Sequence, residues 1–284
     1  RRLQMKIQWF PGHMAKTRRL IEENLRLVDI CVEIADARLV NSSRSPLLFD
    51  LINKKPRILI MNKADIADEK VNNEWKKYFE SEGQAVIFAD SKGGRLLKPL
   101  TAVIQEALKD ELLRRRERGM EGKPVKVMVT GVPNVGKSTF INNISGRKSA
   151  KTGDRPGVTT GKQWIRAGNL ELLDTPGILC PKIDDERMGE HLAFSGAIRD
   201  AVFDTAELSC ILLEFLRDNY AAELCARYKL ADINGLSGFE LLCAVAKARG
   251  FVVRGGEADY ERAAAVVLDE FRGAKIGRIS LERP

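Results

Sequence analysis

The chain has 284 residues, of which 44% are hydrophobic and 30% charged, with a formal net charge of +8. This balance is typical of globular proteins in water, and no apolar run reaches the roughly 18 to 20 residues that a membrane-spanning helix needs. Five scattered cysteines without a C-x-x-C pair and only two histidines disfavour a disulfide framework and a zinc site. We therefore expect a cytoplasmic protein with reduced thiols and no membrane partner.

The first predicted strands are short apolar runs at Ile30–Ile34 and Arg57–Met61, and the second leads into Asn62-Lys63-Ala64-Asp65. The Asp65 carboxylate can accept hydrogen bonds from N1–H and the N2 amino group of guanine, which adenine cannot match, so an unpaired buried carboxylate would penalise ATP. Lys63 can cover the base with its aliphatic stem, and Asn62 can tie this loop to a neighbouring one. The alternative is a helix cap at Asp65.

A helical pattern at Lys70–Glu82 precedes a third strand, Ala85–Ala89, which leads into Asp90-Ser91-Lys92-Gly93-Gly94. Backbone N–H groups of Asp90 and Ser91 can contact guanine O6. The next helical pattern, Pro99–Arg118, ends in a basic linker with two glycines and a proline, Arg114–Pro124.

A strand predicted at Lys126–Thr130 runs into a phosphate-binding loop, Gly131–Ser138, which matches G-x-x-x-x-G-K-[ST] and is followed by a helical stretch at Thr139–Ser145. Backbone N–H groups at the start of that helix can converge on a phosphate. Lys137 can bridge the β- and γ-phosphates, and the Ser138 hydroxyl can bind Mg²⁺. The expected nucleotide contacts here are Asn134, Val135, Gly136, Lys137, Ser138 and Thr139.

Two further strands, Gln163–Arg166 and Glu171–Leu173, precede Asp174-Thr175-Pro176-Gly177. Asp174 can hold Mg²⁺ through water, and the Gly177 N–H can contact the γ-phosphate. A threonine in the loop before these strands can bind Mg²⁺ only while the γ-phosphate is present. We assign this role to Thr159, with Thr160 as the alternative.

Strands that alternate with helices predict a mostly parallel six-stranded sheet with helices on both faces. The base-reading motif precedes the phosphate loop, the reverse of the usual order, so we predict an α/β fold consisting of a circularly permuted Ras-like P-loop GTPase domain. This domain would span residues 1–178. Helical patterns at Leu208–Asn219 and Phe239–Arg249 predict a smaller all-helical domain at 179–284.

These motifs resemble those of the circularly permuted GTPases of ribosome assembly. The resemblance also covers other segments: Trp9–Lys16, Asp36-Ala37-Arg38, Arg155–Thr159, Gln163-Trp164-Ile165 and Gly277–Glu282. It implies a GTPase that uses GTP, GDP and Mg²⁺, binds the precursor of the large ribosomal subunit (rRNA and ribosomal proteins), promotes its late maturation and leaves on hydrolysis. It also implies a helical domain that contacts rRNA. We expect a monomer away from the ribosome.

Charge is distributed unevenly between the two predicted domains. Residues 178–284 hold 14 Lys and Arg against 18 Asp and Glu, so the positive charge lies in residues 1–177. We therefore expect the GTPase domain to supply much of the attraction to RNA, although some basic residues must simply be solvated. Candidate contacts are Arg147, Lys148, Lys151, Arg155, Lys162 and Arg166.

The residue after Gly177 is Ile178, which cannot orient water as the glutamine of Ras-type enzymes does. The resemblance places a catalytic histidine at His13, in the N-terminal segment 1–20, and histidine can orient or polarise water. The alternative is that His13 packs or caps a helix. Asn134 can help to bind K⁺ beside the β–γ bridge, which would stabilise developing negative charge; its alternative role is loop geometry.

Two other functions are compatible with parts of the sequence. One is an RNA-binding assembly module whose nucleotide is mainly structural, which the intact Lys137, Ser138, Thr159 and Asp174 disfavour. The other is a GTPase acting on another RNA or on a membrane, disfavoured because the chain has no basic amphipathic anchor.

Overall fold

The structure is a computed structural model that describes residues 11–44, 46–52, 55–90, 96–146, 163–175, 177 and 185–284. These residues fall into two compact units. The sheet unit comprises the residues up to position 183 together with Ser280–Pro284, and the helical unit comprises the residues from position 184 to 279. No helix in the described part of the chain is long and apolar enough to cross a membrane.

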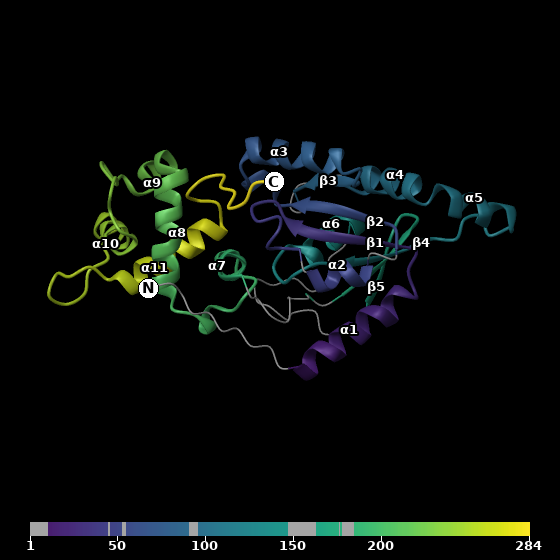
Figure 1. The fold of residues 1–284 in the computed structure, drawn as a ribbon, viewed down its shortest axis with the longest axis horizontal. Coiled ribbons are helices and arrows are strands. Elements are labelled where there is room, and N and C mark those ends of the chain that lie inside the picture. Colours follow the sequence, from purple (N-terminus) through teal and green to yellow (C-terminus); the bar gives the residue numbers. More distant parts are fainter. Residues whose placement is uncertain are drawn as a thin grey trace. The chain divides into compact units, whose positions relative to one another are not determined.

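Six strands form one sheet in the order β3-β2-β1-β4-β6-β5 (Figure 1). Neighbouring strands are parallel except for β5 and β6, which are antiparallel. The six apolar runs in the sequence predict each strand to within one or two residues at each end. Their bounds are β1 Ile30–Asp36, β2 Arg57–Asn62, β3 Val86–Ala89, β4 Val125–Thr130, β5 Gln163–Ala167 and β6 Leu170–Asp174.

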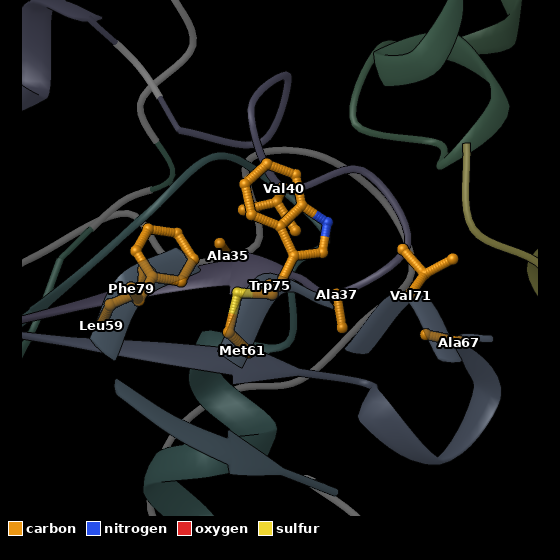
Figure 2. Close-up of a cluster of buried hydrophobic side chains, with 9 residues drawn as sticks. All are labelled: Ala35, Ala37, Val40, Leu59, Met61, Ala67, Val71, Trp75 and Phe79. Carbon is orange, nitrogen blue, oxygen red and sulfur yellow. The ribbon is translucent and has the colours of Figure 1, made fainter. Parts of the chain in front are cut away.

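Three helices, α1 (Pro11–Leu25), α2 (Pro46–Ile52) and α3 (Glu69–Ser81), pack on the same face of the sheet. Side chains alternate between the two faces of a strand, and this face carries Cys31 and Ala35 of β1, among others. The cluster under α3 is built around Trp75 and Phe79, whose rings stack against each other and cover the ends of β1 and β2 (Figure 2).

The opposite face of the sheet is buried too, since Ile58 and Ile60 of β2 are fully inaccessible. Helix α4 (Leu97–Ala107) lies against β2, and α6 (Lys137–Ser145) lies against β5 and β6. Both faces of the sheet are therefore covered.

The single helical pattern predicted at Pro99–Arg118 is two helices, because the chain leaves helical geometry at Leu108. Helix α4 buries Leu100 and Ile104, whereas α5 (Lys109–Glu117) buries no side chain. The Asp29 carboxylate accepts hydrogen bonds from the Arg115 guanidinium and from the backbone N–H of Lys126 at 2.9 Å. This contact fastens the predicted linker, and the start of β4 that follows it, to the residue just before β1.

The helical unit has five α-helices among its described residues. Side-chain caps begin several of them: Asp185, Asp204 and Asp259 accept from backbone N–H groups, and Ser237 and Glu240 form a capping box. The apolar stripes of α8, α10 and α11 meet in one core. The helices are α7 Glu186–Phe194, α8 Thr205–Asn219, α9 Ala221–Tyr228, α10 Gly238–Ala248 and α11 Tyr260–Arg272.

The last five residues, Ser280–Pro284, pack on the sheet unit, whereas the sequence assigned them to the helical domain. The backbone N–H of Leu281 donates to the Arg38 carbonyl at 2.6 Å, and the Trp75 indole N–H donates to the Glu282 carbonyl at 3.3 Å. The C-terminus accordingly lies beside α3 (Figure 1). These contacts hold the segment to the first unit.

Candidate nucleotide-binding site

The predicted motifs meet at one edge of the sheet. Four parallel strands that are neighbours in the order β2-β1-β4-β6 end at Asn62, Asp36, Thr130 and Asp174. In open α/β sheets, ligands bind in the crevice outside the carboxyl ends of the strands. The base-reading motif and the phosphate loop follow β2 and β4, so both lie at this edge although their order along the chain is inverted.

The phosphate loop has backbone geometry that its residues dictate. Gly131 has a φ of 149°, and a Cβ there would lie 2.3 Å from the Ile34 carbonyl oxygen, so only glycine fits. Asn134 (φ 61°) and Gly136 (φ 95°) are both left-handed, and α6 begins at the next residue, Lys137. The loop therefore directs the N-terminus of α6 toward the crevice, and the N-terminus of a helix favours an anion.

The Lys137 ammonium is already turned into the phosphate loop. Its Nζ donates to the carbonyl oxygens of Gly131 at 3.1 Å and Val132 at 2.8 Å, and the residue is buried. Burial lowers the pKa of Lys137 to about 8, against the opposing effect of the nearby Asp174 carboxylate. A phosphate anion in the loop would offset the cost of burying the charged ammonium, so the loop fits a polyphosphate.

The Asp174 loop lies against the phosphate loop. The Thr175 hydroxyl donates to the Val129 carbonyl at 2.8 Å, which fixes the chain where β6 ends. A Cβ on Gly177 would lie 2.9 Å from the Pro133 backbone, so the close approach of the two loops requires glycine.

The oxygen atoms at this point suit Mg²⁺. The Asp174 carboxylate is buried at 1% exposure, and Ser138 stands one residue into α6. Carboxylate and hydroxyl oxygens are the hard ligands that Mg²⁺ accepts, with phosphates and water completing its shell. No cluster of three or more His, Cys, Asp or Glu side chains that could hold a metal occurs in the described residues.

The base-reading motif is fastened at both ends. The fully buried Asn62 side chain donates from Nδ2 to the Val135 carbonyl at 2.6 Å, the tie to a neighbouring loop that the sequence predicts. The Ala64 carbonyl accepts from the Asn72 side chain of α3 at 3.0 Å. Asp65 is exposed, whereas the sequence predicts a buried carboxylate at this position. Its desolvation therefore depends on a base that covers it.

Asp36 and Arg38 form a feature whose role the motifs do not reveal. Both side chains are almost fully buried, and the Asp36 carboxylate accepts from Arg38 Nε at 3.1 Å and Nη2 at 3.0 Å. It also accepts from Lys63 Nζ at 2.8 Å. Burial alone would raise the pKa of Asp36, but the two cations outweigh it and hold the pKa well below its usual range. The Lys63 ammonium is thus held by the buried Asp36 carboxylate, at the end of the strand that lies between β2 and β4.

Comparison with known proteins identifies the family. A protein named ribosome biogenesis GTPase A from Bacillus cereus is 42% identical over 281 residues, which cover 99% of this chain and 95% of that protein. The chain belongs to the ribosome biogenesis GTPase A family. Residues 126–234 also match the family described as 50S ribosome-binding GTPase.

Two solved structures share the fold of this ribosome biogenesis GTPase A family member. GDP-bound TM YlqF has a TM-score of 0.69 and 29% identity, and covers 94% of this chain and 99% of its own. GNP-bound YlqF from T. maritima has a TM-score of 0.64 and 28% identity, with 95% and 98% covered. The circularly permuted GTPase fold, guanine-nucleotide binding and GTP hydrolysis predicted from the sequence are therefore confirmed.

Several predicted site residues of this ribosome biogenesis GTPase A family member fall outside the described part of the chain. His13 lies in α1, but the structure does not describe its side chain. Four other predicted residues are also outside the described part of the chain: Ser91, Thr159, Thr160 and Ile178. Asp90 directly follows β3 and is half-buried. Of the candidate RNA contacts, Arg166 is exposed on β5, and the others are outside: Arg147, Lys148, Lys151, Arg155 and Lys162.

Proposed function

We propose that the nucleotide lies across the carboxyl edge of the sheet, with guanine at Asn62–Asp65 and the phosphates at Gly131–Ser138. The bond from Asn62 to the Val135 carbonyl carries this proposal, because it joins the base-reading loop to the phosphate loop. Asp65 accepts from guanine N1–H and N2, and the Asp90 and Ser91 backbones contact O6. Asn134, Val135, Gly136, Thr139 and Gly177 supply further contacts to the nucleotide.

Hydrolysis in this proposal depends on charge stabilisation at the phosphates. Lys137 bridges the β- and γ-phosphates. Ser138, Thr159 and, through water, Asp174 would hold Mg²⁺, which would supply positive charge that neutralises the phosphates. His13 orients the attacking water, since Ile178 cannot. Asn134, whose backbone is in the left-handed region, helps to bind K⁺.

The proposed target is the precursor of the large ribosomal subunit. The match of residues 126–234 to the family described as 50S ribosome-binding GTPase supports this target, as does the concentration of positive charge in residues 1–177. The GTP-bound protein would bind rRNA and ribosomal proteins and promote a late maturation step, and hydrolysis, stimulated by the subunit, would release it. Away from the ribosome the protein would be a monomer in the cytoplasm.

Cosedimentation with large subunits tests this target. We expect the protein to pellet with precursor large subunits in a non-hydrolysable GTP analogue, to remain in the supernatant with GDP, and to dissociate as salt rises. Small subunits are the matched control. Equal binding to both subunits, or binding that is independent of the nucleotide, would contradict the proposal and favour an RNA-binding module with a structural nucleotide.

A further inference from the structure

We propose that the segment Ser280–Glu282 positions the guanine-reading loop, so that nucleotide release and base selectivity depend on the last residues of the chain. The inference rests on the proposed reading of guanine by Asn62–Asp65. It goes beyond that proposal because it assigns a positioning function to residues that lie more than 200 positions away along the chain.

Glu282 contacts the loop that follows β1. Its carboxylate accepts from the backbone N–H of Asn41 at 2.6 Å, from that of Ser42 at 3.2 Å, and from the Ser42 hydroxyl. Hydrogen bonds to an ionised acceptor are roughly twice as strong as neutral ones. Glu282 therefore fixes the backbone of this loop, as a capping residue fixes the start of a helix.

A series of hydrogen bonds connects this loop to Lys63. The neighbouring Ser43 hydroxyl accepts from the Asp36 backbone N–H at 2.9 Å. Leu281 donates its N–H to the Arg38 carbonyl, and Arg38 binds the Asp36 carboxylate through two nitrogens. That carboxylate in turn holds the Lys63 ammonium. Each contact is short and buried or partly buried, so a shift of the loop moves the group that holds Lys63.

The segment is also attached to the chain just after the base-reading motif. The Ser280 hydroxyl accepts from the backbone N–H of Asp68 at 3.1 Å, three residues after Asp65. Asp68 is also the N-cap of α3, because its carboxylate accepts from the Lys70 N–H at 2.9 Å. Ser280 and Leu281 are both buried, at 5% and 8% exposure. The segment thus bridges the loop after β1 and the loop after β2, on both sides of Lys63 and Asp65.

The geometry has a consequence for nucleotide exchange. The segment is the direct continuation of the helical unit, which ends at Ile279. A partner that binds that unit and displaces the segment would therefore remove the hydrogen bonds that position the base-reading loop, without acting directly on the phosphate loop.

The test measures release of fluorescently labelled GDP and the preference for GDP over inosine diphosphate, which lacks the N2 amino group. We expect Glu282→Ala to accelerate GDP release about tenfold, which corresponds to about 1.4 kcal/mol, and to reduce the preference for GDP, with Glu282→Gln in between. Arg283→Ala is the matched control. Arg283 is the next residue after the segment, and its ion pair with Glu74 of α3 joins two exposed side chains; we expect no change.

A merely structural role would lower the melting temperature without altering base preference, so unchanged GDP release and preference in a folded Glu282→Ala protein would overturn the inference. Should that variant not fold, Ser280→Ala, which removes the acceptor of the Asp68 N–H, must show the same direction of change. Asp65→Asn separates the two proposals. If it leaves the GDP preference unaltered, the guanine reading itself fails; if it abolishes the preference while Glu282→Ala leaves both GDP release and the preference unchanged, only the positioning role fails.

Discussion

Replacing Asn62 by alanine should separate the base-reading loop from the phosphate loop. The side chain is fully buried, and its Nδ2 donates to the Val135 carbonyl at 2.6 Å. Without it, a buried carbonyl loses its donor, which costs about 1–3 kcal/mol. Nucleotide binding requires the base-reading loop and the phosphate loop to keep their relative positions. We therefore expect GDP affinity to fall about 5- to 150-fold, the equivalent of that free energy. The melting temperature should fall by about 2–4 °C per kcal/mol.

Isothermal titration calorimetry with GDP and thermal melting measure the two effects. Asn219→Ala is the matched control, because Asn219 also donates from Nδ2 to a backbone carbonyl, that of Phe215 at 3.0 Å, but within α8 of the helical unit. It should leave GDP affinity unchanged. An Asn62→Ala protein that binds GDP as tightly as the unaltered protein would refute the coupling of the two loops.

Three further predictions follow from the site. Burial lowers the pKa of Lys137 to about 8, and bound phosphates should raise it, so GDP binding should take up a proton above about pH 8 and weaken as pH rises further. Calorimetry at pH 8.5 in two buffers of different ionisation enthalpy measures this proton uptake. A binding enthalpy that is the same in both buffers would show that Lys137 is already fully protonated and would contradict the prediction. His13→Ala should retain GDP affinity but slow subunit-stimulated hydrolysis by about 10²- to 10⁴-fold, and unchanged turnover would exclude the catalytic role. Hydrolysis should be faster in K⁺ than in Na⁺ at equal ionic strength, whereas equal rates would reject the K⁺ site at Asn134.

The sheet could be predicted from the sequence because its strands are buried on both faces and read as continuous apolar runs, such as Ile58-Leu59-Ile60-Met61. The break between the two helices at Leu108 could not be predicted in this way. Leu100, Ile104, Leu108 and Leu112 continue one helical stripe, and only the tertiary structure shows that the part before the break packs on the sheet while α5 does not.

Two parts of the site were beyond the sequence for a different reason. Asp36 belongs to a segment shared with the family, but its role depends on Lys63, 27 residues away, and on the burial of both Asp36 and Arg38. The return of Ser280–Glu282 to the sheet unit depends on hydrogen bonds across 207 to 241 residues. Neither segment is long enough to show a periodicity, so local patterns carry no information about these contacts.

The central claim is that loops in inverted chain order form one guanine-nucleotide site at the carboxyl edge of the sheet. A crystal structure with a non-hydrolysable GTP analogue and Mg²⁺ tests it most directly. We predict guanine N1 and N2 within hydrogen-bond distance of the Asp65 carboxylate, the β-phosphate enclosed by Gly131–Ser138, and Mg²⁺ beside Ser138 and Asp174. A base bound away from Asp65, or phosphates outside the loop, would contradict the account.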